Sequence, residues 1–311
     1  MNFRNISLIF ILFILFGCAD SKQNSRITVI ATLFPQYDFA KQIVKDKADV
    51  RLLIPPGIEA HTYEPTPRDI SEIRKAGVFI YTGEYMEPWS LKLIQTVKNN
   101  SLIIVDASAG IHLMDESEEP GHEHGKGNQS AEHERGTKDP HIWVDPVLAK
   151  RMAENVLVGL IKANPENESF YKANADSLIK ELDRLNTEFT DLFKKVKYKT
   201  IIHGGHFTFG YFSKRYGLKY ISPYSGFSPN AEPSPQKIAE LIKTIKATGL
   251  KIIYYEELID PKAARVISRQ TGAKMLLLHG AHNVSGEEIN TGVTYVSIMR
   301  GNLERLREGL N

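Results

Sequence analysis

The chain has 311 residues, of which 24% are charged and 42% hydrophobic, and its net charge is +2 at pH 7. This is the profile of a globular protein long enough for two domains of ordinary size. The near-neutral charge, without a basic stripe, argues against nucleic acid as a partner. A single cysteine, Cys18, excludes an internal disulfide and a metal site built from cysteine ligands.

The first residues have the pattern of an export signal. Arg4 precedes an apolar run, residues 6–16, that is too short to span a bilayer. The run ends at Cys18, in a sequence that resembles a bacterial lipobox except for the bulky Phe16. We expect residues 1–17 to be a signal peptide and residues 18–26 a tether, with lipidated Cys18 anchoring the protein to a membrane. An ordinary cleaved signal or a buried strand is the alternative.

Short runs of apolar, β-branched residues alternate with helical patterns in both halves of the chain. This alternation favours parallel βα units, and strands that are apolar throughout are covered on both faces. The expected strands are residues 27–31, 50–54, 78–81, 102–105, 200–203, 218–221, 251–255 and 274–278. We therefore predict an α/β protein with two lobes, residues 27–145 and 198–311, each a parallel β-sheet flanked by helices.

A long helical stretch, residues 146–197, connects the two predicted lobes. Asp145 suits an N-cap and Pro146 a first helical turn, whereas Pro165 interrupts the pattern. From residue 166 to 197, apolar residues recur at three- and four-residue intervals, as in an amphipathic helix. A helix of about 30 residues would be about 45 Å long, at 1.5 Å per residue. We expect it to form a rigid spine along both lobes.

Residues 115–138 have almost no apolar side chains and are rich in Glu, Gly and His. Such a segment cannot bury a core, so we expect a mobile loop within the first lobe. Its histidines, His122, His124 and His133, are either loose metal ligands or part of a solvated insertion.

Four histidines lie far apart in the sequence, beside turns or at the ends of apolar runs: His61, His141, His206 and His282. Neutral imidazole is a common metal ligand, and four imidazoles would fill the tetrahedral shell that zinc prefers. Their wide spacing excludes a zinc finger or a His-Glu-x-x-His helix, in which ligands are close in sequence. The fold would have to bring them together, two from each half, which predicts a metal ion between the lobes.

Five motifs surround these histidines, in order along nearly the whole mature chain. They are PPGIEAHTYEP (55–65), DPHIWVDP (139–146), HFTFGYF (206–212), AEPSP (231–235) and YYEE (254–257). Together they resemble the zinc/manganese solute-binding receptors of ABC importers. The resemblance implies two α/β lobes joined by a rigid helix, one metal ion in the cleft, and a monomer that docks on an ABC permease. A His-rich loop before the second ligand is typical of zinc-handling members.

Carried over position by position, the resemblance implies that the first three of these histidines are metal ligands. The family usually has an aspartate at the fourth position, where this chain has histidines at residues 279 and 282. Counting forward from the strand at 274–278 and back from Tyr295 places His282 at that position. His279 is then an outer group or an alternative ligand.

Four nitrogen ligands without a carboxylate favour zinc over manganese, which prefers oxygen ligands. Histidine in place of aspartate also removes one negative charge from the shell. Each ligating imidazole should donate its other N–H to a carboxylate or carbonyl group. The candidates from the sequence are Asp145, Glu64 and Glu256.

The resulting hypothesis is a surface-tethered receptor, periplasmic or on the cell surface, that captures zinc and delivers it to a permease. A closed four-ligand shell leaves no position for a nucleophilic water, so no catalysis is expected. A manganese or iron receptor of the same family is the alternative. A less favoured one is a hydrolase that uses His61, His141 and His206 with a zinc-bound water. Some relatives of these receptors are also adhesins, which the sequence does not test.

Overall fold

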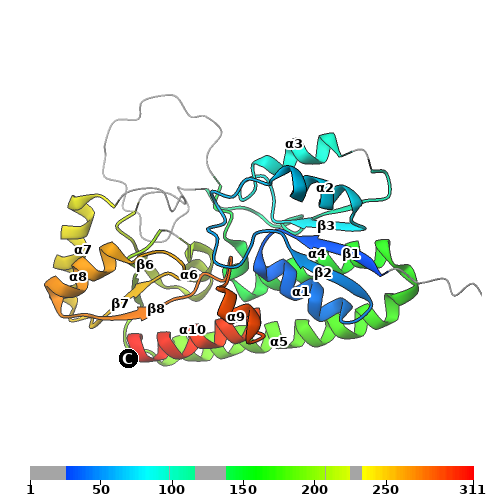
Figure 1. Cartoon of the computed structure of the whole chain (residues 1–311). Helices are drawn as coiled ribbons and strands as arrows, with labels where there is room; N and C mark the ends of the chain where they lie inside the picture. The colour runs from blue at the N-terminus through cyan, green and yellow to red at the C-terminus, as the bar shows by residue number, and fades with distance from the viewer. Residues whose placement is uncertain (1–25, 98, 116–137, 207, 225–232) are drawn as a thin grey trace, which may run out of the picture.

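The computed structural model describes residues 26–97, 99–115, 138–206, 208–224 and 233–311 (Figure 1). The predicted signal peptide, Cys18 and the three histidines of the predicted loop lie outside these residues. The two ends of that loop are described: Asp115 and Lys138 form an antiparallel bridge and an ion pair. Within the described residues, no helix is both long enough and apolar enough to cross a membrane.

The first half of the chain forms a four-stranded parallel sheet in the order β2-β1-β3-β4. Its strands are β1 (Ile27–Ala31), β2 (Ala48–Leu52), β3 (Val78–Tyr81) and β4 (Ile103–Asp106). In the register, Val29 of β1 lies opposite Val50 of β2 and Val78 of β3. β3 is buried at all four positions, as expected for a central strand with helices on both faces.

Helices cover both faces of this sheet: α1 (Phe34–Val44), α2 (Pro67–Lys75), α3 (Trp89–Thr96) and α4 (Pro146–Ala163). Successive residues of β1 point to opposite faces, as in any strand. Val29 packs in the same apolar cluster as residues of α1 and α4, whereas Ile30 packs with residues of α2 and α3. Figure 1 shows these two helix pairs on opposite sides of the sheet.

The second half contains two pairs of parallel strands. The pairs are β5 (Thr200–Ile202) with β6 (Lys219–Ile221), and β7 (Ile252–Tyr255) with β8 (Lys274–Leu277). A parallel bridge between His203 and Tyr254 links β5 to β7. The helices are α6 (Gly210–Tyr216), α7 (Pro235–Thr248), α8 (Lys262–Thr271), α9 (Gly286–Asn290) and α10 (Tyr295–Leu310). The α/β class and the parallel sheets flanked by helices are confirmed.

The 28-residue helix α5 (Glu168–Lys195) is the spine that the sequence predicts. At 1.5 Å per residue it is about 42 Å long. Its apolar face shares one core cluster with α1, α4 and α10, and so contacts both halves of the chain (Figure 1). Arg300 of α10 is paired with Glu181 and Glu188 of α5. The turn that Pro165 begins, η3 (Pro165–Asn167), separates α5 from α4, as expected from the proline.

The strand β2 spans residues 48–52, whereas the sequence predicts it two residues later, at 50–54. Ala48 and Asp49 have low strand propensity, but they pair with Ile27 and Thr28 of β1, and this pairing outweighs propensity. The other expected strands differ from the structure by at most one residue at either end.

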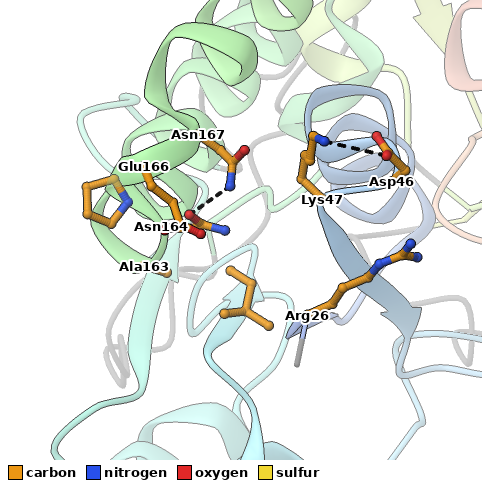
Figure 2. A pocket seen from close by; sticks show the side chains of 9 residues that line it. Arg26, Asp46, Lys47, Ala163, Asn164, Glu166 and Asn167 are labelled. Carbon is orange, nitrogen blue, oxygen red and sulfur yellow. Dashed lines mark hydrogen bonds and ion pairs between the residues drawn. The ribbon is translucent and has the colours of Figure 1, made fainter. Parts of the chain in front are cut away.

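The carboxyl ends of strands in both halves lead into the segments that carry three of the predicted ligands: His61 follows β2, His206 follows β5, and His282 follows β8. A hollow of about 520 Å³ lies elsewhere, where the start of β1 meets the α1–β2 turn and the α4–α5 connection (Figure 2). Polar side chains line it, including Arg26, Lys47 and Glu166. This hollow is therefore at the amino ends of the strands, away from the histidines.

Candidate metal centre

The structure brings three of the four predicted ligands into one cluster. Nitrogen atoms of His61, His141 and His206 all lie within 4.8 Å of one another. The Nε2 atoms of His61 and His141 are 3.0 Å apart, and the ring centroids in the cluster are separated by 5.0 to 5.4 Å. Two nitrogens bound to one tetrahedral zinc ion are about 3.3 Å apart, given bonds of about 2.0 to 2.1 Å. The three side chains therefore have the spacing of a metal site.

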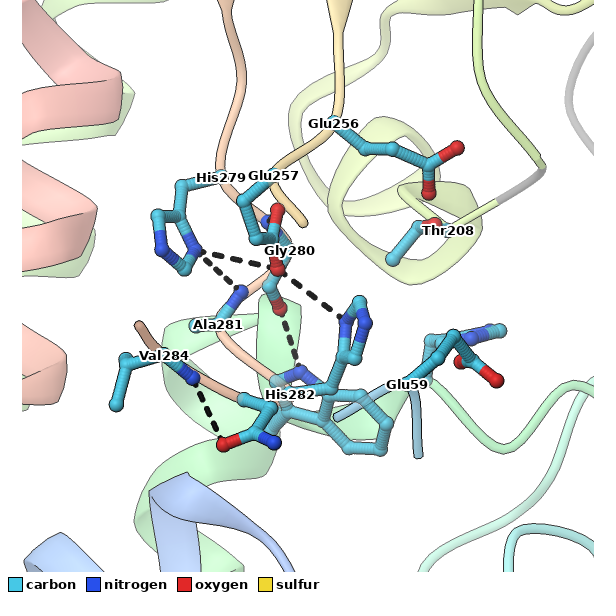
Figure 3. Close-up of polar contacts among 12 residues, drawn as sticks. Glu59, Thr208, Glu256, Glu257, His279, Gly280, Ala281, His282 and Val284 are labelled. Carbon is cyan, nitrogen blue, oxygen red and sulfur yellow. Dashed lines mark hydrogen bonds and ion pairs between the residues drawn. The ribbon is translucent and has the colours of Figure 1, made fainter. Parts of the chain in front are cut away.

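His282 lies beside this cluster and outside the 4.8 Å group. Its ring centroid is 6.2 Å from those of His61 and His206, and its side chain is buried. The other candidate, His279, lies on the far side of Glu257 (Figure 3). The Nδ1 atom of His279 accepts the backbone N–H of Ala281 at 2.9 Å, and its Nε2 atom is 3.4 Å from Glu288. The geometry thus favours His282 over His279 at the fourth position.

A short loop after β2 positions His61. Gly57 has a φ of +84°, in the region that glycine adopts without strain, and this allows the chain to turn after two prolines. The Glu59 carboxylate then accepts the backbone N–H groups of His61 and Thr62, both at 3.0 Å. Because these bonds are local, they fix the shape of the loop.

Asp139 positions His141. Its Oδ1 atom accepts the backbone N–H of His141 at 2.9 Å and lies 2.8 Å from the Nδ1 atom of the ring. This contact leaves Nε2 to face the cluster. The Tyr211 hydroxyl donates to the backbone carbonyl of Asp139 at 2.7 Å, which ties the segment to α6. A ligating histidine usually contacts a carboxylate through one ring nitrogen and the metal ion through the other.

Glu256, which directly follows β7, has the same role for His206. Its carboxylate contacts Nδ1 of the ring and accepts the backbone N–H of His206 at 3.2 Å. The Nε2 atom is 3.1 Å from the Thr208 hydroxyl. A Cβ atom at Gly205 would lie 2.4 Å from the Glu256 carboxylate, so a side chain there would displace it.

Glu257 lies between His279 and His282, and its Oε1 atom is 3.3 Å from Nδ1 of His279. Its carboxylate lies 3.4 Å from Nδ1 of His282 and accepts the backbone N–H of Gly280 at 2.7 Å (Figure 3). The indole N–H of Trp143 donates to the carbonyl of Gly280, also at 2.7 Å. The loop that carries His282 is therefore held by one group from its own half and one from the helical segment after His141.

The four imidazoles differ in basicity. Burial, and then the neighbouring histidines, hold the pKa values of His61 and His141 well below the usual value. Burial also lowers the pKa of His282, although Glu257 opposes it. Burial alone would lower the pKa of His206 too, but the Glu256 carboxylate outweighs it and the pKa is raised. At neutral pH the rings of His61, His141 and His282 are thus neutral and able to bind a metal ion.

The expectations about supporting carboxylates were right only for Glu256. Asp145 instead caps α4 through the backbone N–H of Val147 and pairs with Arg215. Glu64 is exposed. Asp139 and Glu257 were not predicted. Asp139 could have been found, since an aspartate two residues before a histidine can bond both its backbone N–H and its ring.

Comparisons with known proteins identify relatives of this chain. Residues 29–309 match the family described as zinc-uptake complex component A, periplasmic. The high-affinity zinc uptake system protein ZnuA of Bacillus subtilis is 40% identical over 294 residues, which cover 94% of this chain and 90% of that protein. The zinc-binding lipoprotein AdcA of Streptococcus pneumoniae is 32% identical over 295 residues. These residues are 94% of this chain but 58% of AdcA.

The crystal structure of the Zn(II)-bound ZnuA-like domain of Streptococcus pneumoniae AdcA superposes with a TM-score of 0.76 and 30% identity. The match covers 92% of this chain and 99% of that domain. Because the family match spans almost the whole described chain, the chain belongs to the periplasmic zinc-uptake component A family of solute-binding receptors.

Proposed function

We propose that this chain is the extracytoplasmic receptor of an ABC importer, which captures one zinc ion between its two lobes and delivers it to the permease. The observation that carries the proposal is the cluster of His61, His141 and His206, whose nitrogens lie within 4.8 Å of one another. Relatives named for zinc uptake and zinc binding support zinc as the cargo.

We propose His61, His141, His206 and His282 as the zinc ligands. All-nitrogen coordination suits zinc and other late transition metals better than manganese, which prefers oxygen. The buried carboxylates of Asp139, Glu256 and Glu257 are not needed as ligands, because each already lies against a ring nitrogen of one of these histidines. These carboxylates contact the ligands and not the ion; they orient the rings, and their negative charge offsets the positive charge of the ion.

Such a site binds a metal ion but does not catalyse a reaction. The family is one of binding receptors, and four protein ligands would close the tetrahedral shell of zinc. A hydrolytic zinc site keeps a position open for water, which would require His282 to stay away from the ion. The proximity of His282 to the cluster favours the closed shell.

The spine helix α5 bears on how zinc is released. It packs against helices of both halves through one continuous apolar core, so a wide hinge motion would expose much of that core. We propose that release involves small tilts and movements of the ligand loops. A large difference in X-ray scattering between metal-free and zinc-bound protein would contradict this.

We also propose that Cys18 is lipidated and anchors a monomeric receptor at the membrane. The lipobox-like sequence before it supports this proposal, and the relative AdcA is named a lipoprotein. Labelling cells with a radioactive fatty acid tests it. A Cys18→Ser variant that is labelled as strongly as the wild type would contradict it.

Elemental analysis tests the central proposal. The purified protein, dialysed against a trace mixture of divalent metals, is expected to retain one zinc ion per chain, and His141→Ala is expected to lose it. His112→Ala is the matched control, because His112 is exposed. Bound manganese in place of zinc would contradict the all-histidine shell, and absence of metal would contradict the receptor itself.

A further inference from the structure

Asn283, next to the proposed ligand His282, joins the two halves of the chain. Its side chain is buried, and its amide nitrogen donates to the backbone carbonyls of Pro55 at 2.8 Å and Ile58 at 2.7 Å. The side-chain oxygen accepts the backbone N–H of Val284 at 2.8 Å. The side-chain amide therefore donates both of its hydrogens to one turn of the other lobe.

Backbone hydrogen bonds on either side of Asn283 continue this contact. The N–H of Gly57 donates to the carbonyl of Val284 at 2.8 Å, and the N–H of Phe34 donates to the carbonyl of His282 at 3.2 Å. The segment 282–284 thus lies along the turn 55–58 and the start of α1. We call this set of contacts the interlobe seam.

The turn that Asn283 holds leads within three residues to His61. The bonds that Glu59 makes to the backbone of His61 and Thr62 fix the loop's own shape, but they do not fix its position relative to the other lobe. The Asn283 amide does, because it contacts both ends of the turn. His61 is also half-buried, whereas His141, His206 and His282 are buried. The surrounding side chains therefore restrain His61 less than they restrain the other three histidines.

We infer that Asn283 is a positioning residue for zinc binding: its two hydrogen bonds across the interlobe seam fix His61 relative to His282, so that both ligands are in place before the ion arrives. The inference rests on the proposed ligand roles of these two histidines. Holding ligands in their bound geometry lowers the entropy cost of binding. Asn283 itself does not contact the metal ion in this arrangement.

A double-mutant cycle tests the inference. Zinc dissociation constants are measured with a competing fluorescent chelator for the wild type, Asn283→Ala, His61→Ala and the double variant. The matched control is Asn155→Ala, because the Asn155 amide also donates to two backbone carbonyls, those of Ala107 and Ala109, but within the first half of the chain. Asn155 lies on α4 and is not part of the histidine cluster.

Asn283→Ala is expected to raise the dissociation constant about tenfold in the wild type, as removal of groups that support ligands commonly does. In the His61→Ala background it should change the constant by less than about twofold, since the ligand it positions is gone. Asn155→Ala should stay within about twofold of the wild type. Equal weakening in both backgrounds, or no weakening in the wild type, would overturn the inference.

Two further measurements separate this role from a general loss of stability. In metal-free protein, hydrogen exchange at the Gly57 amide should be faster in Asn283→Ala than in Asn155→Ala, and equal rates would overturn the inference. Asn283→Asp keeps the size of the side chain but loses both donors, so it should bind zinc at least as weakly as Asn283→Ala. If His61→Ala alone leaves zinc affinity unchanged, the proposed ligand set fails, an outcome distinct from failure of the coupling.

Discussion

Replacing Glu256 by glutamine tests how the buried carboxylates act. The substitution keeps the size of the side chain and removes its charge beside Nδ1 of His206. Loss of such an outer partner commonly lowers metal affinity 10- to 100-fold, which corresponds to about 1.4 to 2.7 kcal/mol. We expect a loss of about tenfold at pH 7.5, because glutamine still offers an oxygen to the ring nitrogen.

The effect should depend on pH in a particular direction. Glu256 raises the pKa of His206, so as the pH falls the wild type begins to protonate this ligand early, and zinc must displace the proton. Below that pKa each pH unit costs about 1.36 kcal/mol of binding free energy for one proton. In Glu256→Gln the pKa of His206 falls, so this competition begins at lower pH. The affinity gap between the two proteins should therefore narrow between pH 7.5 and pH 5.5.

The assay is chelator competition at pH 7.5, 6.5 and 5.5 in constant salt. Glu64→Gln is the control, since Glu64 is an exposed glutamate in the His61 loop motif. Gly205→Ala offers an independent perturbation, because its Cβ would lie 2.4 Å from the Glu256 carboxylate and should displace it. Two affinity curves that fall in parallel with pH would refute the argument, as would wild-type affinity in Glu256→Gln.

Three other predictions follow from the structure. His282→Ala should weaken zinc binding about tenfold or more in the same assay, and His279→Ala much less; the reverse order would make His279 the ligand. Zinc at 100 times its dissociation constant should raise the free energy of unfolding by about 2.7 kcal/mol, and an unchanged melting temperature would contradict this. Burial raises the pKa of Glu87 from 4.5 to about 7. Its contribution to stability should therefore be present below pH 4.5 and be lost as the pH rises through 7, by up to about 3 kcal/mol. In urea unfolding of metal-free protein, Glu87→Gln should lack this decline between pH 5 and pH 8, and an equal decline in both proteins would disprove it.

Much of the fold could be predicted where a strand is buried on both faces, because such a strand is apolar throughout. The residues of β3 are apolar and fully buried, and they were predicted at their correct bounds. Asp145 and Pro146 likewise mark the start of α4. The bounds of β2 were displaced because its first residues, Ala48 and Asp49, are held in the sheet by pairing with β1 and not by their own propensity.

That His61, His141 and His206 lie together could be predicted because the motifs around them resemble those of a known family of metal receptors. Of the carboxylates that support them, only Glu256 was predicted, because whether a carboxylate reaches a ring depends on how the loops pack. Asp139 and Asp145 flank the same histidine, yet Asp139 bonds the ring and Asp145 pairs with Arg215. Asn283 contacts Pro55 across 228 residues, and no local pattern marks that contact.

The four histidines of the proposed metal centre are unequally buried, so the centre is more accessible from one side than from the others. His141, His206 and His282 are between 0% and 1% exposed, whereas His61 is only half-buried. If these rings hold zinc as proposed, an incoming ligand, whether a chelator or a side chain of the permease, would approach the ion from the His61 side. Transfer of zinc would then be an ordered ligand exchange, in which the bond to His61 is replaced first. The other three histidines would hold the ion until ligands of the acceptor have replaced them.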